Sequence, residues 1–172
     1  PGPVEDHISH AAAFGAVVDQ APARALDLGA GGGLPGLVLA ASVWPGTAWT
    51  FVDANLRRTE FLREAVEALD LSGRVAVVTE RAEVVAQDPA HRGSYQLVVA
   101  RSFASPAITA ECAAPLLDVG GLLVVSEPPD VDLATRWPGD PLAAIDRHGA
   151  GFGRGESDGG ERITRPDVSV AG

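Results

Sequence analysis

Short apolar runs alternate with longer segments in which apolar residues recur every three or four positions. The runs predict buried strands at residues 24–28, 48–53, 75–79, 95–100 and 122–126. The intervening segments predict amphipathic helices at residues 4–19, 34–43, 56–69, 82–87 and 106–117. This alternation is typical of βαβ units, in which helices cover both faces of a parallel sheet. Right-handed crossovers would then bring the carboxyl ends of the strands to one edge, where ligands bind.

Single residues mark where these elements should begin. Pro35 is expected in the first turn of its helix, where its missing N–H has no cost. Asn55 and Ser105 are expected to cap the helices that follow them. Gly120-Gly121 is expected to turn the chain into the fifth strand.

The alternating pattern decays after residue 127. Breakers become frequent there, and only a short helix at 142–147 and two strands at 150–152 and 162–170 are predicted. We expect the 172 residues to form one domain, 1–172. Its well-patterned core would span 4–127, and 128–172 would be a degenerate C-terminal part.

A glycine-rich turn follows the first predicted strand. Residues 26–36 read LDLGAGGGLPG, so the strand leads into Gly29, Gly31 and Gly33 just before a helix that starts near Pro35. Glycine permits positive φ and a close approach of backbone to a ligand. The N-terminus of the helix presents unpaired N–H groups to a polar ligand. The segment is typical of a turn that cradles a nucleotide.

Two nucleotide cofactors fit this turn to different degrees. Gly31, Gly33 and Gly36 also fit the G-x-G-x-x-G pattern of dinucleotide-binding proteins, and Asp53 at the end of the second strand suits the ribose of either cofactor. Asp27 favours S-adenosyl-L-methionine, because a carboxylate beneath the turn can receive the methionine ammonium or fix the loop. NAD turns usually have an apolar residue there, and the chain offers no hydride-transfer constellation downstream.

Composition and charge narrow the class of protein further. The net charge is −10 and all 13 basic residues are arginine, which lowers the expectation of a large RNA-binding face. The apolar runs are far shorter than a membrane span requires. Cys112 is the only cysteine, so no internal disulfide can form, and it is expected as a small buried group on a helix. A cytoplasmic protein that does not enter a membrane is therefore expected.

Four segments together resemble the RsmG family, also called glucose-inhibited division protein B. They are residues 26–36, 52–63 (VDANLRRTEFLR), 81–83 (RAE) and 99–101 (VAR), and the likeness covers about residues 4–127. Members of this family are bacterial methyltransferases that act on N7 of a guanine in 16S ribosomal RNA. The resemblance implies S-adenosyl-L-methionine as cofactor and the 16S rRNA of the 30S subunit as partner. It also implies an α/β, Rossmann-like class I methyltransferase fold, with a mostly parallel seven-stranded sheet and helices on both faces.

The resemblance also implies roles for residues along the predicted strand ends. Gly29 and Leu34 would contact the cofactor in the first turn. Asp27, Gly31 and Gly33 are expected to bind it on the evidence of the turn itself. The same likeness implies that Asp53 holds the ribose and that Ala82 and Glu83 lie beside the adenine. The Ala82 backbone or the Glu83 carboxylate would accept from the exocyclic amine.

Arg101 is the candidate catalytic residue, since the resemblance places it near the cofactor and the incoming base. Methyl transfer from a sulfonium is an in-line displacement with a neutral leaving group, and guanine N7 needs no deprotonation. Orientation and exclusion of water can therefore carry the catalysis without a general base. Guanine presents O6 and N7 together, and an arginine matches that geometry.

Structural alternatives stay open for several of these residues. Asp53 could cap the following helix, Glu83 could be a first-turn carboxylate favoured by the helix dipole, and Arg101 could pair with Glu127. His7, which would match a histidine of the family's N-terminal helix, and His10 are three apart but lack a third ligand, so no metal is expected.

Aromatic side chains offer little sign of a base-binding platform. Trp44, Trp49 and Trp137 are expected to pack in the interior rather than to stack on bases.

Departures from the family's pattern keep other functions in view. His10-Ala11 stands where the family has an Asp-Ser pair, the N-terminal helical segment is shorter, and Glu127 replaces a lysine-bearing segment at the rim. A carboxylate at that rim would repel RNA. The chain is thus expected to be a divergent member. The alternatives to rRNA methylation are a methyltransferase of the same lineage with a small-molecule or other acceptor, and a non-catalytic relic that binds cofactor or a partner protein.

Overall fold

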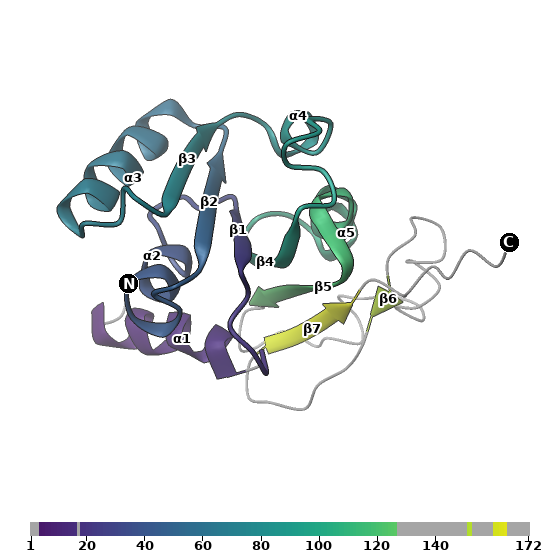
Figure 1. Ribbon diagram of the computed structural model, residues 1–172, viewed down its shortest axis with the longest axis horizontal. Coiled ribbons are helices and arrows are strands. Elements are labelled where there is room, and N and C mark those ends of the chain that lie inside the picture. The colour runs from purple at the N-terminus through teal and green to yellow at the C-terminus, as the bar shows by residue number, and fades with distance from the viewer. Residues whose placement is uncertain (1–3, 17, 127–150, 153–159, 165–172) are drawn as a thin grey trace, which may run out of the picture.

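The computed structural model describes residues 4–16, 18–126, 151–152 and 160–164. They form a seven-stranded sheet in the order β3-β2-β1-β4-β5-β7-β6 (Figure 1). Neighbouring strands among β1 to β5 are parallel, whereas β7 runs antiparallel to both β5 and β6. The strands are β1 Arg24–Leu28, β2 Ala48–Asp53, β3 Val75–Thr79, β4 Tyr95–Arg101, β5 Leu117–Ser126, β6 Gly151–Phe152 and β7 Gly160–Thr164.

Helices cover both faces of this sheet, as predicted. They are α1 Val4–Ala16, α2 Gly36–Val38 with its π-helical continuation η1 Leu39–Val43, α3 Leu56–Ala68, α4 Ala82–Val85, and α5 Pro106–Ala113 with the 3-10 turn η2 Ala114–Leu116. Among the described residues, no helix is both long enough and apolar enough to cross a membrane.

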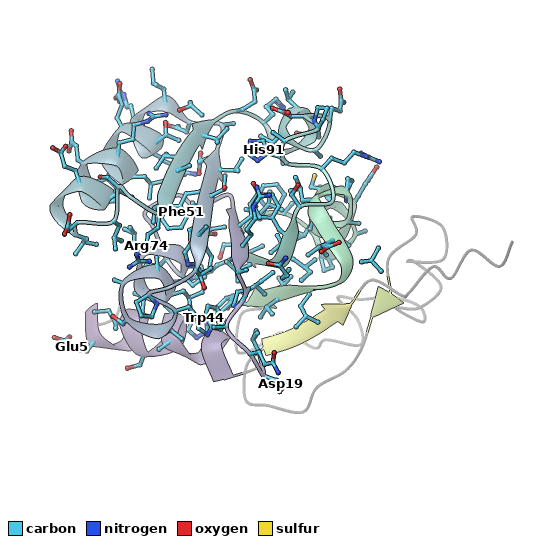
Figure 2. All side chains as sticks on the ribbon, viewed as in Figure 1. Glu5, Asp19, Trp44, Phe51, Arg74 and His91 are labelled. Carbon is cyan, nitrogen blue, oxygen red and sulfur yellow. The ribbon has the colours of Figure 1, made fainter. Side chains whose placement is uncertain are left out.

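Alternation along the strands divides the core in two. In β4, Leu97 and Val99 pack with α1, η1 and α3, while Val98 and Ala100 pack with α4 and α5. All four side chains are fully buried, so β4 is apolar on both faces, as a central parallel strand requires. Trp44, labelled near α1 in Figure 2, packs in the same buried cluster as Phe14 of α1 and Leu39 of η1.

Two predicted helices differ from the structure at their ends. The helix predicted at 34–43 begins at Gly36, and Pro35 is its N-cap residue, joined to Leu34 by a cis peptide bond. Its second half widens to a π-helix. The helix predicted at 106–117 leaves α geometry after Ala113 because Pro115 lacks an N–H and would clash one turn back.

The fifth strand begins earlier than predicted. Tyr95 pairs with Leu117, but Leu97 pairs with Leu122, so β5 carries extra residues at this point. The glycine pair lies between these two pairings, within β5. Gly120 has a φ of +79°, as is common where a strand is irregular. The prediction that the strand begins only after this pair was therefore wrong.

Smaller differences occur at both ends of the chain. The first helix ends at Ala16 rather than at residue 19, and the last strand begins at Gly160 rather than at residue 162. The helix predicted at 142–147 lies outside the described residues. The prediction of a single domain over 1–172 also extends beyond them and stays a prediction.

Candidate functional site

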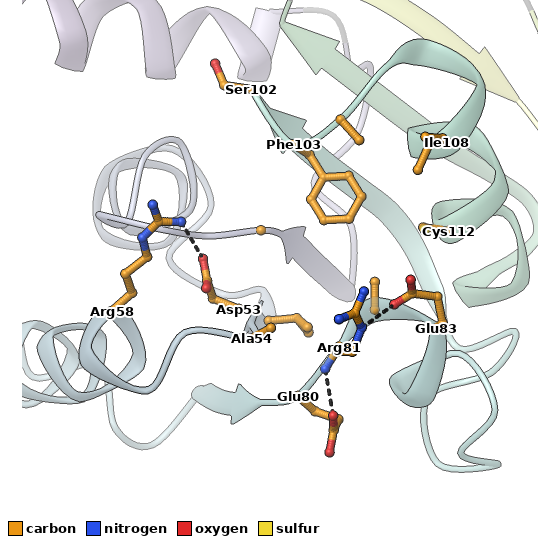
Figure 3. Close-up of a pocket in the computed structure, with 14 residues that line it drawn as sticks. Asp53, Ala54, Arg58, Glu80, Arg81, Glu83, Ser102, Phe103, Ile108 and Cys112 are labelled. Atoms are coloured by element: carbon orange, nitrogen blue, oxygen red, sulfur yellow. Dashed lines mark hydrogen bonds and ion pairs between the residues drawn. The ribbon is translucent and has the colours of Figure 1, made fainter.

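A pocket of about 380 Å³ lies at the carboxyl edge of the sheet (Figure 3). It is formed where four parallel strands end, which is the place that the chain topology predicts for a ligand. Its lining comes from the loops after β1 to β4 and from residues of β2, α3, α4 and α5. The lining residues are Gly29, Val52, Asp53, Ala54, Arg58, Glu80, Arg81, Ala82, Glu83, Ser102, Phe103, Ala104, Ile108 and Cys112.

The turn after β1 depends on glycine. Gly29 has a φ of +72°, and a Cβ added there would lie 2.5 Å from Phe103 Cδ2. Its N–H and that of Ala30 donate to the Val52 carbonyl, at N···O distances of 2.8 and 3.0 Å, which ties the turn to β2. Gly33 also has positive φ, and a Cβ there would collide with the Leu37 side chain. The turn therefore presents bare backbone to the pocket.

Asp27 lies beneath this turn and is only 1% exposed. Its Oδ2 accepts from the Gly36 N–H at 2.8 Å, which joins β1 to the start of α2. The pKa of Asp27 is raised to about 7, mainly by burial. The Gly36 hydrogen bond and the Arg101 charge lower this pKa, and the nearby charge of Asp53 raises it. Of its two predicted roles, fixing the loop is the one that this geometry displays.

Asp53 links the end of β2 to the tip of the glycine turn. Its Oδ2 accepts from the Gly31 N–H at 3.0 Å and lies 3.6 Å from Arg58 Nη1, while its Oδ1 accepts from the Asn55 N–H at 2.8 Å. The cap of α3 is Asn55, whose Oδ1 accepts from the Arg58 N–H at 3.3 Å. The capping role considered for Asp53 thus belongs to Asn55, as the sequence also predicted, and the Asp53 carboxylate faces the pocket (Figure 3).

Charged side chains surround the pocket beyond the end of β3. Arg81 Nε lies 3.7 Å from Glu83 Oε2, and the two side chains are 73% and 57% exposed. The Arg81 N–H donates to Glu80 Oε1 at 2.8 Å. Ala82, in contrast, is buried at the first position of α4. Glu83 lies in the first turn of α4 and also lines the pocket, so both of its predicted roles suit its position.

The end of β4 leads directly into the pocket wall. Arg101 is the last residue of the strand and is half-buried. Ser102 follows with a φ of +53°, a conformation uncommon for residues other than glycine. This bend carries Phe103 against Gly29, so the aromatic ring forms a wall of the pocket (Figure 3).

Known proteins are similar to this chain in sequence and in fold. The model of the family GidB: rRNA small subunit methyltransferase G matches residues 3–127. The chain belongs to this family. The predicted resemblance is confirmed, as is the Rossmann-like α/β methyltransferase fold.

Curated members of the GidB family are clearly similar over part of their length. The ribosomal RNA small subunit methyltransferase G of Prochlorococcus marinus (strain MIT 9313) is 44% identical over 102 residues, which cover 59% of this chain and 41% of that protein. The Chloroflexus aggregans protein of the same name is 38% identical over 127 residues, or 74% and 50% of the two chains. The chain thus spans half or less of the length of these relatives.

A solved structure supports the fold independently of close sequence similarity. The putative methyltransferase yhhF from Escherichia coli superposes with a TM-score of 0.66 at 16% identity. The match covers 96% of this chain and 89% of that one.

The structure brings some of the predicted site residues together and leaves others outside the pocket. Gly29, Asp53, Ala82 and Glu83 line it. The predicted residues that do not line it lie beneath or beside the turn, or at the end of β4: Asp27, Gly31, Gly33, Leu34 and Arg101. The contacts of these nine residues with a cofactor stay predictions. The catalytic role of Arg101 also stays a prediction.

Sequence reasoning missed the apolar wall and the arginines of the rim. Phe103 and Ile108 line the pocket, as do Arg58 and Arg81. Phe103 follows a strand end by two residues, which was the one available signal. Cys112 was predicted as a buried helical side chain; this is confirmed at 8% exposed, but it also lines the pocket.

The remaining candidate groups are the histidines and the tryptophans. Among the described residues, no cluster of three or more potential metal-binding side chains occurs. Trp44 and Trp49 are buried and stacked on each other, so packing is confirmed for these two. The side chain of His7, Trp137 and the pairing of Arg101 with Glu127 lie outside the described residues.

Proposed function

We propose that this chain is an S-adenosyl-L-methionine-dependent methyltransferase that acts on N7 of a guanine in the 16S rRNA of the 30S subunit. One observation carries the proposal. The Asp53 carboxylate is bonded to the Gly31 N–H at the edge of a pocket whose opposite wall is Phe103, in a chain that belongs to the GidB family. Such a protein would work in the cytoplasm, where the 30S subunit is found.

The residues around the pocket suit each part of this cofactor. The Asp53 carboxylate keeps acceptor capacity for ribose hydroxyls, because each of its oxygens accepts one backbone hydrogen bond and has a further lone pair. Phe103, Ala82 and Ile108 provide apolar surface for a purine ring, and Glu83 provides an acceptor for its amine. Gly29 lines the pocket with backbone alone, and its missing side chain leaves room for the Phe103 ring.

The reaction asks little acid–base chemistry of the protein. The bound cofactor supplies a methyl group on a sulfonium; as the bond from its carbon to guanine N7 forms, the bond to sulfur breaks. The sulfur becomes a neutral thioether and the positive charge moves to the base, so no proton is transferred. The protein must then orient the two reactants and exclude water.

The charge of the rim favours a second candidate. The net charge is −10, and Glu80 and Glu83 stand at the rim beside Arg58 and Arg81. Because two glutamates balance the two arginines, the rim lacks the excess positive charge that attracts a phosphate backbone. The second candidate is therefore the same methyl transfer to a small-molecule acceptor.

A methyl-transfer assay separates these candidates. The full chain is incubated with S-adenosyl-L-methionine labelled in the methyl group and with 30S subunits from a strain that lacks the guanine mark. Label in 7-methylguanosine of 16S rRNA supports the proposal. Cofactor binding without label in RNA favours the small acceptor or a non-catalytic binding protein, and absence of cofactor binding contradicts all three.

Arg101→Ala tests the candidate catalytic residue. The variant is expected to lose at least tenfold in turnover while its cofactor affinity changes less than threefold, because the guanidinium would act on the base rather than on the cofactor. Arg24→Ala is a matched control, since Arg24 is the first residue of β1, at the opposite edge of the sheet. Unchanged turnover in Arg101→Ala would refute the role.

A further inference from the structure

The carboxyl edge of the sheet continues past the proposed cofactor pocket. The pocket is lined by the loops after β1, β2 and β3 and by the bend after β4. Beyond it lie the last residues of β4 and β5, Arg101 and Ser126, which are paired in register. A methyl acceptor must approach from a side that the cofactor does not fill. This second stretch of the edge is the side available to it.

His10 reaches this stretch from the beginning of the chain. It lies on α1, and its Nε2 is 2.7 Å from Ser126 Oγ, although the residues are 116 positions apart. Both residues are half-buried, so each keeps some surface exposed. The edge of the His10 ring packs against Phe14, with 6.1 Å between ring centroids, which restricts its orientation. An imidazole, a hydroxyl and a guanidinium are thus gathered at adjacent strand ends.

We propose that Ser126 and Arg101 form the subsite for the methyl acceptor, that His10 orients the Ser126 hydroxyl there, and that the subsite takes a purine base with an acceptor-rich edge. The proposal rests on the proposed function, since it requires a cofactor in the neighbouring pocket. Arg101 would donate to O6, leaving the N7 lone pair for the methyl carbon. The Ser126 hydroxyl can donate or accept a hydrogen bond. Its bond to His10 uses one of these capacities and so determines whether the hydroxyl donates to the base or accepts from it. His10 is therefore a positioning residue.

The hydrogen bond between His10 and Ser126 is removed in His10→Ala, in Ser126→Ala and in the double variant. His10→Gln can retain this bond through its side-chain amide. The matched control is His91→Ala, because His91 Nδ1 lies 2.5 Å from Tyr95 Oη. Tyr95 is the first residue of β4 and Arg101 the last, so the control removes a similar bond at the opposite edge. Each protein is measured for Tm, cofactor affinity, and kcat and KM with undermethylated 30S subunits.

Both single variants are expected to raise KM for the acceptor about tenfold, the effect of one lost hydrogen bond, with cofactor affinity unchanged. The double variant should be no worse than Ser126→Ala alone, because His10 acts on the acceptor only through the Ser126 hydroxyl. His10→Gln should recover most of the loss. His91→Ala should keep the wild-type KM even where its Tm falls. An unchanged KM in His10→Ala, or an equal rise in His91→Ala, would overturn the proposal.

A second readout does not depend on turnover. The imidazole NMR signals of His10 and His91 are followed while guanosine 5′-monophosphate is added to the full chain saturated with S-adenosylhomocysteine. A shift of the His10 signal alone supports the subsite, even if the chain fails to methylate 30S subunits and the proposed function fails. No shift at His10 overturns the subsite, even if methylation is observed.

Discussion

At the scale of single residues, the turn after β1 shows how one missing side chain shapes a site. Gly29 combines positive φ with a close approach to Phe103, whereas Gly32, in the same turn, has open space around it. Gly29→Ala is expected to weaken cofactor binding at least tenfold and to cost about 1–2 kcal/mol of stability, because strain and collision act together. Gly32→Ala should leave both nearly unchanged. Calorimetric titration and thermal unfolding measure the two effects; equal losses would contradict this account.

Asp27 makes stability depend on pH in a defined direction. Burial raises its pKa from 3.8 to about 7 in the folded chain, so the folded state keeps a proton that the unfolded state releases above pH 4. Its contribution to the free energy of unfolding therefore falls as pH rises, until pH exceeds about 7. Relative to Asp27→Asn, which can still accept from Gly36, the wild type should lose about 2–3 kcal/mol between pH 5 and pH 8. Urea denaturation of both proteins checks this, and a constant difference would refute it.

Sequence reasoning at this scale was strongest where a residue type has few alternatives. The positive φ of three turn glycines and the carboxylate at the end of β2 follow from the motif and were found. Phe103 was missed because its role depends on the bend at Ser102, a conformation that a serine does not signal. Arg58 and Arg81 were missed because solvated arginines on helices and loops are common.

At the scale of elements, two helix starts provide a matched pair. Asn55 Oδ1 accepts from the Arg58 N–H, whereas Ser105 stands at the N-cap of α5 without a side-chain capping bond. Asn55→Ala is expected to lower the free energy of unfolding by about 1 kcal/mol, the usual worth of a cap. Ser105→Ala should change it by less than half as much. Chemical denaturation decides, and equal effects of the two substitutions would contradict the assignment.

Strands and helices were predicted well in their order and less well at their ends. Apolar runs identified the five parallel strands because β1, β2, β4 and the second half of β5 are buried on both faces. The edge strand β3 is only partly buried but is still an unbroken apolar run. The early start of β5 was missed because a Gly-Gly pair is typical of a turn between elements. In the structure Leu117, which precedes Gly120-Gly121, already pairs with Tyr95, so the glycine pair lies within the strand. The π-helical segment Leu39–Val43 has no local signal, since tertiary packing selects it.

At the scale of the whole molecule, the topology determines how sequence-distant groups meet. The turn after β1 and the end of β2 are adjacent because β1 and β2 are parallel neighbours, which joins Gly31 to Asp53 across 22 positions. The βαβ pattern predicted this meeting. It did not predict that His10 would reach Ser126, because no periodicity in α1 indicates which strand end it meets. Contacts between distant elements depend on packing that a single sequence does not display.

The central claim is that the pocket at the carboxyl edge holds S-adenosyl-L-methionine through Asp53. Titration calorimetry of the full chain with this cofactor tests it most directly, with Asp53→Asn and the control Asp88→Asn, whose carboxylate accepts from the Ala90 N–H in a loop away from the pocket. The account predicts saturable binding at one site in the wild type and in Asp88→Asn, and at least tenfold weaker binding in Asp53→Asn. No binding to the wild type, or equal affinity in Asp53→Asn, would contradict it.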